Sequence, residues 1–209
     1  MKLRLNKNGE KMIKNIVFDL GNVILKGSPN IVLEQIKIDK KQYESIKNDF
    51  FNDWKSLDLG GSTLREQLEK CKFDFEIDSE IEEKLLHYYK YRPFNVEILE
   101  LIKELKNKGY KIYILSNNNK EAEKYLLEIP DFKAFDGWIF SCDYQIMKPD
   151  PKIYNILFET YNLKPEECFF IDDSRKNIET GNKLGMAGFV LDCEHNGIAE
   201  LRKELKNVL

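Results

Sequence analysis

From residue 92 onward the chain alternates short apolar segments with amphipathic ones, and this alternation limits the possible fold more than any other feature. Within this part, short apolar strands are predicted at 110–116, 137–141, 168–172 and 188–192, and helices at 95–108, 119–128, 150–161, 175–184 and 197–206. A further apolar strand is predicted near the start of the chain, at 16–20. Continuous apolar strands alternating with helices are typical of a parallel sheet with both faces covered. The sequence therefore predicts an α/β fold built on a parallel sheet.

The stretch between the first strand and residue 92 has a different pattern. Its apolar residues recur at helical spacing, which predicts four helices with no strand between them. Thr63 and Glu66 form a capping-box pattern after Gly60-Gly61, so a helix is expected to begin there. This stretch is predicted to be a helical insertion.

These two patterns divide the chain into a core of residues 12–28 and 92–209, a helical insertion of residues 29–91, and an N-terminal extension of residues 1–11. Two segments are candidate hinges, Gly27-Ser28-Pro29 and Arg92-Pro93.

Charge and composition exclude several classes of protein. The 33 basic and 36 acidic residues are finely mixed, which argues against a nucleic-acid groove or an anionic membrane surface. No apolar run is long enough to span a bilayer, and the first twelve residues lack the apolar segment of a signal peptide, so a cytoplasmic protein is expected. The oligomeric state is left open between a monomer and a homodimer. The four scattered cysteines indicate reduced thiols: Cys71, Cys142, Cys168 and Cys193.

Polar residues stand at or just beyond the ends of four predicted strands. Asp19 ends the first, Ser116-Asn117 the second, and Asp172-Asp173 the fourth, while Lys148 follows the third. Each alone is explained as a helix cap or a loop residue. Ligands of open parallel sheets bind at the carboxyl ends of the strands, so four such residues at one edge indicate a site.

Three carboxylates and one ammonium would leave this edge net negative. A phosphate dianion would be repelled unless a divalent cation bridged it to the acids, and Mg²⁺ prefers such oxygen ligands. Asp19 is then a candidate metal ligand and nucleophile, with Ser116, Asn117 and the amides of the next helix holding the phosphate oxygens. Lys148 would neutralise developing charge.

The sequence strongly resembles the haloacid dehalogenase superfamily of phosphohydrolases. The resemblance rests on four blocks in the family's order: "VFDLGNV", "ILSNNN", "KPDPKIY" and "FFIDDSRKNIETGNKLGM". It implies a Rossmann-like core, magnesium, and phosphatase action on a small phosphorylated metabolite, with the insertion as a mobile helical cap.

The resemblance also implies the site. By it Asp19 is the nucleophile, Ser116 and Lys148 bind phosphate, and Asp172 and Asp173 complete the magnesium site, with Asp173 the stronger candidate for a direct ligand.

One departure from the family pattern concerns proton transfer. The family usually has a second Asp, a general acid and base, where this chain has Gly21, which still offers the backbone carbonyl that the metal takes there. A subgroup sharing the "FDLGNV" block, the bacterial α-D-glucose-1-phosphate phosphatases, is similar throughout. Without the acid we expect slow turnover and a preference for good leaving groups such as sugar 1-phosphates, with Asn22 or a water relay partly substituting.

Other functions stay open at this point. A hydrolytic dehalogenase also uses a lone Asp, but its family replaces the late acidic pair with a Ser-Ser-Asn pattern. A sugar phosphomutase depends on the missing acid, and in a signalling receiver domain the acidic pair comes first. A catalytically weak or inactive binding protein is the remaining alternative. In the insertion, aromatic and acidic side chains are candidates to contact substrate: Trp54, Asp58, Tyr88, Tyr89 and Tyr91.

Overall fold

The computed structural model describes residues 13–52, 54–192 and 197–208, which contain a five-stranded sheet in the order β3-β2-β1-β4-β5. All four strand pairs are parallel. The strands are β1 (Asn15–Phe18), β2 (Lys111–Ser116), β3 (Gly137–Phe140), β4 (Cys168–Asp172) and β5 (Ala187–Val190). The predicted α/β class and parallel sheet are confirmed.

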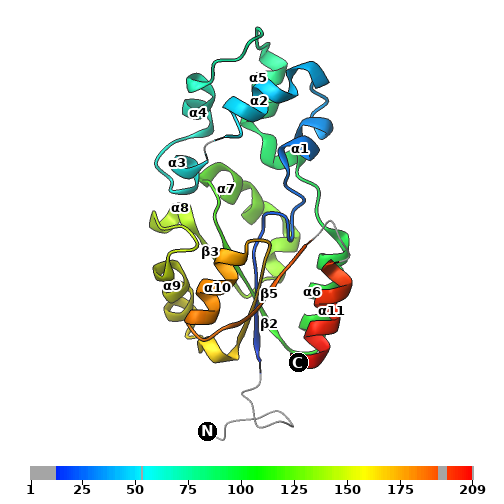
Figure 1. The fold of residues 1–209 in the computed structure, drawn as a ribbon, viewed down its shortest axis with the longest axis vertical. Coiled ribbons are helices and arrows are strands. Elements are labelled where there is room, and N and C mark those ends of the chain that lie inside the picture. The colour runs from blue at the N-terminus through cyan, green and yellow to red at the C-terminus, as the bar shows by residue number, and fades with distance from the viewer. Residues whose placement is uncertain (1–12, 53, 193–196, 209) are drawn as a thin grey trace, which may run out of the picture.

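Helices cover both faces of the sheet (Figure 1). They are α6 (Val96–Asn107), α7 (Lys120–Glu128), α8 (Ser141–Tyr144), α9 (Pro151–Tyr161), α10 (Arg175–Lys183) and α11 (Gly197–Val208), with short 3₁₀ helices η3 (Pro130–Ala134) and η4 (Pro165–Glu167). Apolar residues of α6, α7 and α11 pack in one buried cluster, and those of α9 and α10 in a second cluster on the opposite face. Burial on both faces explains why the strand sequences are continuously apolar.

A helical block, residues 29–91, lies beyond the carboxyl ends of the strands (Figure 1). It contains α1 (Pro29–Gln35), α2 (Tyr43–Asp49), α3 (Lys55–Asp58), α4 (Leu64–Lys70) and α5 (Ser79–Leu86), with 3₁₀ helices η1 (Lys40–Gln42) and η2 (Tyr88–Tyr91). The block has a hydrophobic cluster of its own, and the predicted capping box of Thr63 and Glu66 is present. Four helices were predicted, whereas the described residues show a further one, α3, which is too short to give a helical period.

The two segments that join the block to the sheet run side by side. Lys26 N donates to Pro93 O at 2.9 Å, Asn95 N donates to Ile24 O at 2.8 Å, and Leu25 forms an antiparallel bridge with Phe94. We call this pairing the junction. The chain therefore leaves the sheet domain and returns to it at one place.

The remaining expectations concern the termini, cysteines and membrane. The predicted extension of residues 1–11, Met12 and Cys193 lie outside the described residues, while Cys71, Cys142 and Cys168 are free thiols. Among the described residues, no helix is long and apolar enough to cross a membrane.

Candidate active site

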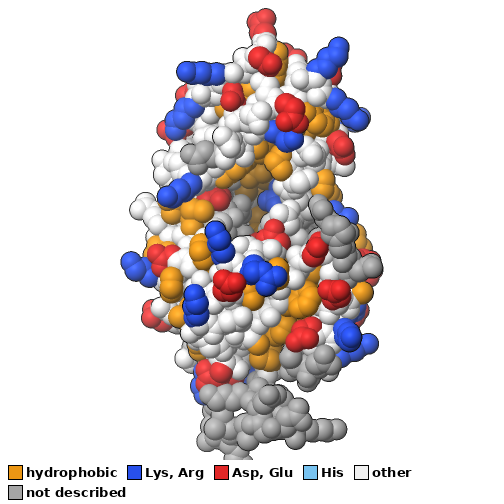
Figure 2. All heavy atoms as spheres, viewed as in Figure 1, with side chains coloured by type: hydrophobic (Ala, Val, Ile, Leu, Met, Phe, Trp, Pro, Cys, Tyr) orange, Lys and Arg blue, Asp and Glu red, His pale blue; other side chains and the backbone are white. Residues whose placement is uncertain are grey.

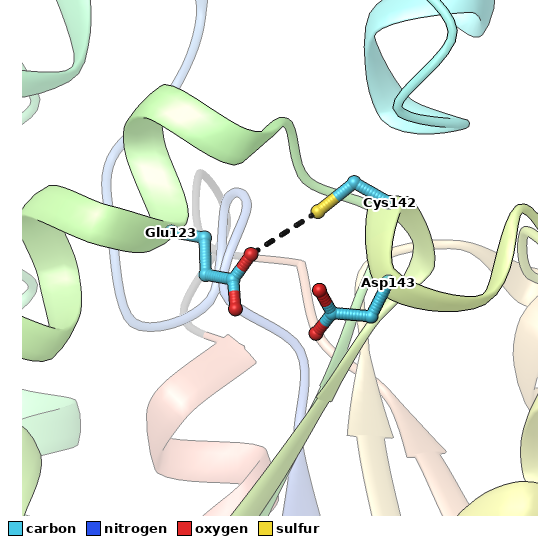
Figure 3. Close-up of side chains that lie close together, drawn as sticks. All are labelled: Glu123, Cys142 and Asp143. Carbon is cyan, nitrogen blue, oxygen red and sulfur yellow. Dashed lines mark hydrogen bonds between the residues drawn. The ribbon is translucent and has the colours of Figure 1, made fainter.

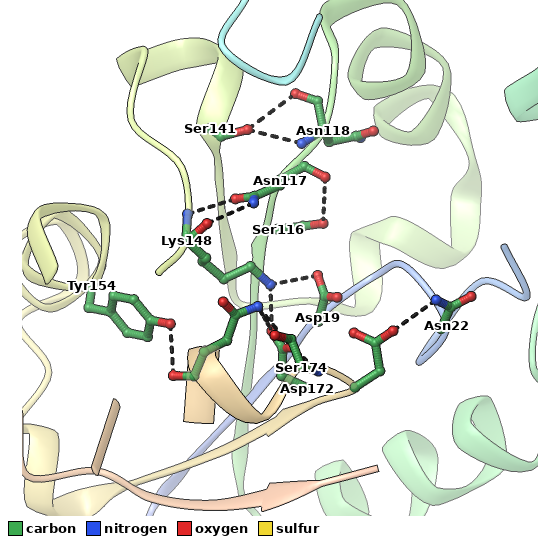
Figure 4. A network of polar contacts seen from close by, with 12 residues as sticks. Asp19, Asn22, Ser116, Asn117, Asn118, Ser141, Lys148, Tyr154, Asp172 and Ser174 are labelled. Atoms are coloured by element: carbon green, nitrogen blue, oxygen red, sulfur yellow. Dashed lines mark hydrogen bonds and ion pairs between the residues drawn. The ribbon is translucent and has the colours of Figure 1, made fainter. Parts of the chain in front are cut away.

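The strand ends bring the predicted residues together at one edge of the sheet (Figure 4). Asp19 follows β1, Ser116 ends β2, and Asp172 ends β4, while Lys148 lies between α8 and α9. All four side chains are buried. Because β1 lies between β2 and β4, the residues at these ends are neighbours in space.

Lys148 joins two of the carboxylates. Its Nζ lies 2.8 Å from Asp19 Oδ1 and 2.6 Å from Asp172 Oδ2. Burial alone would lower the pKa of Lys148, but the charges of Asp19 and Asp172 outweigh it and raise that pKa. The ammonium is therefore charged and compensates part of the negative charge of this edge.

Asp172 is the most fully bonded acid of the site. Besides Lys148, it accepts hydrogen bonds from Ser174 N at 2.8 Å and from Asn177 Nδ2 at 2.9 and 3.0 Å. Tyr154 in turn donates to the Asn177 carbonyl at 2.9 Å. These contacts hold Asp172 in one orientation and leave its oxygens little capacity for a further ligand.

Asp173 is more open than its neighbour. Its side chain is exposed and accepts a hydrogen bond from Asn22 Nδ2 at 2.8 Å. It lines a cavity of about 710 Å³ on the side of Asn22 and Arg175. Although the side chain reaches solvent, surrounding protein atoms remove part of its hydration; this raises the pKa of Asp173, and the bond from Asn22 opposes the shift.

The donor set suits a hard divalent cation. One carboxylate oxygen each from Asp19, Asp172 and Asp173 lies within 4.8 Å of the others. Since Asp172 is occupied by Lys148 and Asn177, Asp19 and Asp173 are the acids with oxygen atoms to offer. Mg²⁺ binds through one or two carboxylates, so the residues fit it.

The environment of Asp19 disfavours its charge in the absence of a cation. Burial raises its pKa to about 6, Lys148 opposes this shift, and the charge of Asp172 adds to it. Three carboxylates facing one lysine leave negative charge at this edge, and a bound cation would offset it.

Ser116 and Asn117 differ in how free they are. The Asn117 side chain donates to Lys148 O at 3.1 Å and accepts from Lys148 N at 2.8 Å, so it holds the lysine backbone in place. Among the described residues, Ser116 Oγ makes a single hydrogen bond, a long one of 3.3 Å to Asn117 O. The Ser116 hydroxyl therefore has more capacity for a ligand oxygen than the Asn117 amide.

A second cavity, of about 310 Å³, lies between the sheet edge and the helical block, where the molecule is hollowed in Figure 2. The sheet domain contributes Gly21, Asn117 and Asn118 to it. The helical block contributes Pro29, Val32, Phe51, Trp54, Asp58 and Tyr88, and the junction contributes Gly27 and Arg92. We call this space the inter-lobe cavity.

Arg92 occupies the space above Gly21. A Cβ built on Gly21 would lie 3.6 Å from Arg92 Nη2, and one built on Gly27 would lie 2.2 Å from the same atom. Arg92 Nε is buried, with no hydrogen-bond partner among the described residues. A guanidinium therefore stands beside the position where the family pattern places a second acid.

Another group of possible ligands lies where α8, which follows β3, approaches α7 (Figure 3). Glu123, Cys142 and Asp143 lie close together, with Cys142 Sγ donating to Glu123 at 3.4 Å. Lys120 contacts Asp143 and lies 3.1 Å from Glu123, so a lysine already balances the acids. This group carries no separate site.

Sequence reasoning missed some residues of the site. Arg92 was named only as part of a candidate hinge. Asn177 was not singled out, although it stands five residues after Asp172 in the first turn of α10, where it can reach back. Of the candidates named in the insertion, Trp54, Asp58 and Tyr88 line the inter-lobe cavity, whereas Tyr89 and Tyr91 are not among its lining residues.

Comparisons with known proteins agree with this geometry. The family model described as haloacid dehalogenase-like hydrolase matches residues 13–185. The D-ribitol-5-phosphate phosphatase of Bacteroides thetaiotaomicron is 28% identical over 214 residues, which cover 95% of this chain and 99% of that protein.

Two further matches differ in extent. The mouse bifunctional epoxide hydrolase 2 is 27% identical over 158 residues, 73% of this chain, and the match spans only 28% of that enzyme. A solved HAD family enzyme from Bacteroides thetaiotaomicron, in complex with magnesium and inorganic phosphate, superposes with a TM-score of 0.69 at 24% identity, covering 87% of this chain and 95% of that one. The last likeness is one of fold.

Proposed function

The chain belongs to the haloacid dehalogenase-like hydrolases, and from that premise we propose that it is a magnesium-dependent phosphatase acting on a small phosphorylated metabolite. The observation that carries the proposal is the cluster of charged side chains at the sheet edge. Lys148 forms ion pairs with Asp19 and Asp172, and carboxylate oxygens of Asp19, Asp172 and Asp173 lie within 4.8 Å of one another. Such a donor set suits a phosphate bridged to carboxylates by a cation.

Asp19 and Asp173 would hold the magnesium ion, with the Gly21 carbonyl as a further ligand and Asp172 orienting Lys148 beside it. The ion supplies charge compensation for the phosphate oxygens. A protein of the same fold has been solved with magnesium and inorganic phosphate together, which supports magnesium as the proposed ion.

Asp19 is the proposed nucleophile. Its carboxylate attacks phosphorus and forms an aspartyl-phosphate, which water then hydrolyses. In this proposal Ser116 donates to a phosphate oxygen, and Lys148 neutralises developing charge while Asn117 fixes the lysine backbone.

The helical block is the proposed cap over the substrate, and residues 27–29 and 92–93 are its proposed hinges. The inter-lobe cavity combines the aromatic rings of Phe51, Trp54 and Tyr88 with polar groups, a surface suited to a carbohydrate. We infer a sugar phosphate as substrate, such as a sugar 1-phosphate. The match to a D-ribitol-5-phosphate phosphatase over most of both chains supports a phosphorylated carbohydrate.

Release of inorganic phosphate from a panel of phosphorylated metabolites, measured with Mg²⁺ and with excess chelator, tests the proposal. We expect turnover of sugar phosphates with Mg²⁺ and none with chelator. Binding of magnesium and a phosphate analogue without turnover would indicate instead a binding protein, and release of halide from haloacids would indicate a dehalogenase.

A further inference from the structure

A phosphatase with glycine at position 21 has no acid on the turn that follows its nucleophile. When the phosphoryl group moves to Asp19, the departing oxygen of an alkyl phosphate needs a proton, and a positioned acid is worth about 10² to 10⁴ in rate. Any such acid must come from another element that faces the same cavity.

Asp58, the last residue of α3, lines the inter-lobe cavity together with Gly21 and Arg92. Its backbone is tied to the sheet domain, because Ser141 Oγ donates to the Asp58 carbonyl at 2.5 Å. The same hydroxyl accepts from Asn118 N at 3.0 Å, and Asn118 stands two residues after the end of β2. Asp58 is thus held against the loop that begins with the proposed phosphate-binding residues.

The turn after α3 fixes this docking further. Gly60 has φ +69°, and a Cβ there would lie 2.7 Å from the Cys142 carbonyl, so the turn packs against α8 backbone to backbone. Only glycine combines that conformation with so close an approach. The position of Asp58 is therefore set by contacts other than its own side chain.

We propose that Asp58 is the general acid and base of the reaction, taking the part that Gly21 cannot play. The inference rests on the proposed phosphatase function. It assigns a catalytic role to a residue of the helical block and places the proton source among the residues that this block contributes to the inter-lobe cavity.

The reaction consists of two displacements at phosphorus. An Asp19 oxygen forms a bond to phosphorus, the phosphorus–oxygen ester bond breaks, and its electron pair goes to the leaving oxygen, which takes the Asp58 proton and departs as an alcohol. Water then attacks phosphorus, the bond to Asp19 breaks with its electrons returning to that carboxylate, and Asp58 takes the proton of the water. Inorganic phosphate leaves, and both side chains are restored.

The electrostatic surroundings suit an acid at neutral pH. Burial and the charge of Asp19 raise the pKa of Asp58 to about 7, and Arg92 and Lys148 oppose that shift. The ideal catalytic pKa lies near the operating pH. The groups that face Asp58 or share its helix are Asp19, Tyr88, Arg92, Lys148 and Lys55.

This assignment changes the expected substrate range. If only Gly21 mattered, sugar 1-phosphates would be strongly preferred over 6-phosphates. With Asp58 supplying the proton, alkyl phosphates of sugars and polyols become substrates as well, and the difference between the two classes narrows.

The test compares leaving groups in the wild type and in Asp58→Asn. kcat/KM is measured with Mg²⁺ for 4-nitrophenyl phosphate, phenyl phosphate and glycerol 3-phosphate. We expect the substitution to lower kcat/KM for glycerol 3-phosphate and phenyl phosphate by about 10²-fold or more, and for 4-nitrophenyl phosphate by less than about tenfold, because that leaving group needs no proton. In the wild type, kcat/KM for phenyl phosphate should fall as the pH rises through about 7. This alkaline limb of the pH profile should be absent from the variant.

Asp74→Asn is the matched control, since Asp74 is an exposed acid of the same block outside the inter-lobe cavity. It should leave all three rates and the pH profile unchanged. Retained turnover of 4-nitrophenyl phosphate by Asp58→Asn shows that the variant is folded.

Equal losses for all three substrates, no loss, or an unchanged pH limb would overturn the role of Asp58 while the phosphatase function stood. A wild type that turns over none of the phosphates, aryl or alkyl, would overturn both.

Discussion

The sheet edge and the inter-lobe cavity are neighbours, since Asn117 lies at the one and lines the other, yet their polar groups are satisfied very differently. At the edge, Lys148 spans two carboxylates, and Asp172 accepts bonds from a lysine, an asparagine and a backbone amide. In the cavity, Arg92 Nε is buried with no partner among the described residues, and the surroundings of Asp58 disfavour its charge.

The difference indicates separate tasks. A saturated network is rigid and fixes charges for a phosphate that is the same in every substrate. Groups left short of partners are available to a variable part of the ligand, and they carry a cost that binding can relieve. Substitutions in the two regions test this contrast.

Asp19→Asn should abolish phosphatase activity, lowering kcat by about 10⁴-fold or more, because the amide is nearly isosteric but cannot form the aspartyl-phosphate. Phosphate release and circular dichroism together check this. Substantial turnover by a folded Asp19→Asn variant would remove the covalent step from the mechanism.

Lys148→Met should destabilise the fold by about 3–5 kcal/mol, because it leaves two buried carboxylates facing each other without a cation. The free energy of unfolding in urea measures the loss. The matched control is Lys111→Met, whose exposed lysine lies 2.8 Å from Asp136 and whose loss should cost far less, because solvent screens an exposed ion pair. Equal costs for the two variants would mean that the edge network is not the rigid region.

Asp173→Ala should lower activity at fixed Mg²⁺ by about 10²-fold or more, since the carboxylate is a proposed ligand of the ion. It should also abolish the rise in Tm that Mg²⁺ gives the wild type. Asp143→Ala, in the group that Lys120 already balances, is the control and should keep that rise. If Asp143→Ala lost it instead, the two acid groups would have to exchange roles.

Asp58→Asn should change how stability depends on pH. The pKa of Asp58 is raised from 3.8 to about 7 in the folded chain, so the folded state binds the proton more tightly. The wild type therefore gains stability from Asp58 at low pH and loses it as the pH rises from about 4 to about 7. Urea unfolding at pH 5 and pH 8 should show the variant gaining about 2 kcal/mol relative to the wild type at the higher pH. A constant difference between the two proteins would place Asp58 in ordinary solvent.

Gly21→Asp should give the smallest effect, at most about tenfold in kcat/KM, and larger for alkyl than for aryl phosphates. The new Cβ meets only ordinary contacts, with Arg92 Nη2 at 3.6 Å and Asp19 Oδ2 at 3.9 Å. The neighbouring guanidinium should hold the added carboxyl ionised, which weakens it as an acid. In the Asp58→Asn background the gain should be larger, and an equal gain in both backgrounds would contradict a shared task for the two positions.

The sheet and its edge could be predicted because each rests on a local pattern. Apolar runs gave all five strands, and parallel strands bring Asp19, Ser116 and Asp172 to one edge whatever the strand order. Their catalytic roles remain predictions. The Asp172–Asn177 bond lies within one turn and was within reach of the same reasoning.

The cavity groups had no such pattern. Helix α3 spans four residues, about one turn, so it leaves no apolar period by which Asp58 could be oriented. Arg92 reaches the cavity because Gly21 and Gly27 both lack a Cβ in its path, a packing relation between distant residues. Such features depend on tertiary contacts, which a single sequence does not display.

The junction has an evolutionary consequence. Lys26 pairs with Pro93, and Asn95 pairs with Ile24. For the sheet domain, the whole segment between these pairs is therefore one long loop whose two ends are held together. Lengthening such a loop costs only about 0.6 kcal/mol for each doubling. The segment also folds around a hydrophobic cluster of its own. Lineages could therefore exchange, shorten or replace it without rebuilding the phosphate-handling edge, and new specificities would arise by recombination at residues 26 and 93.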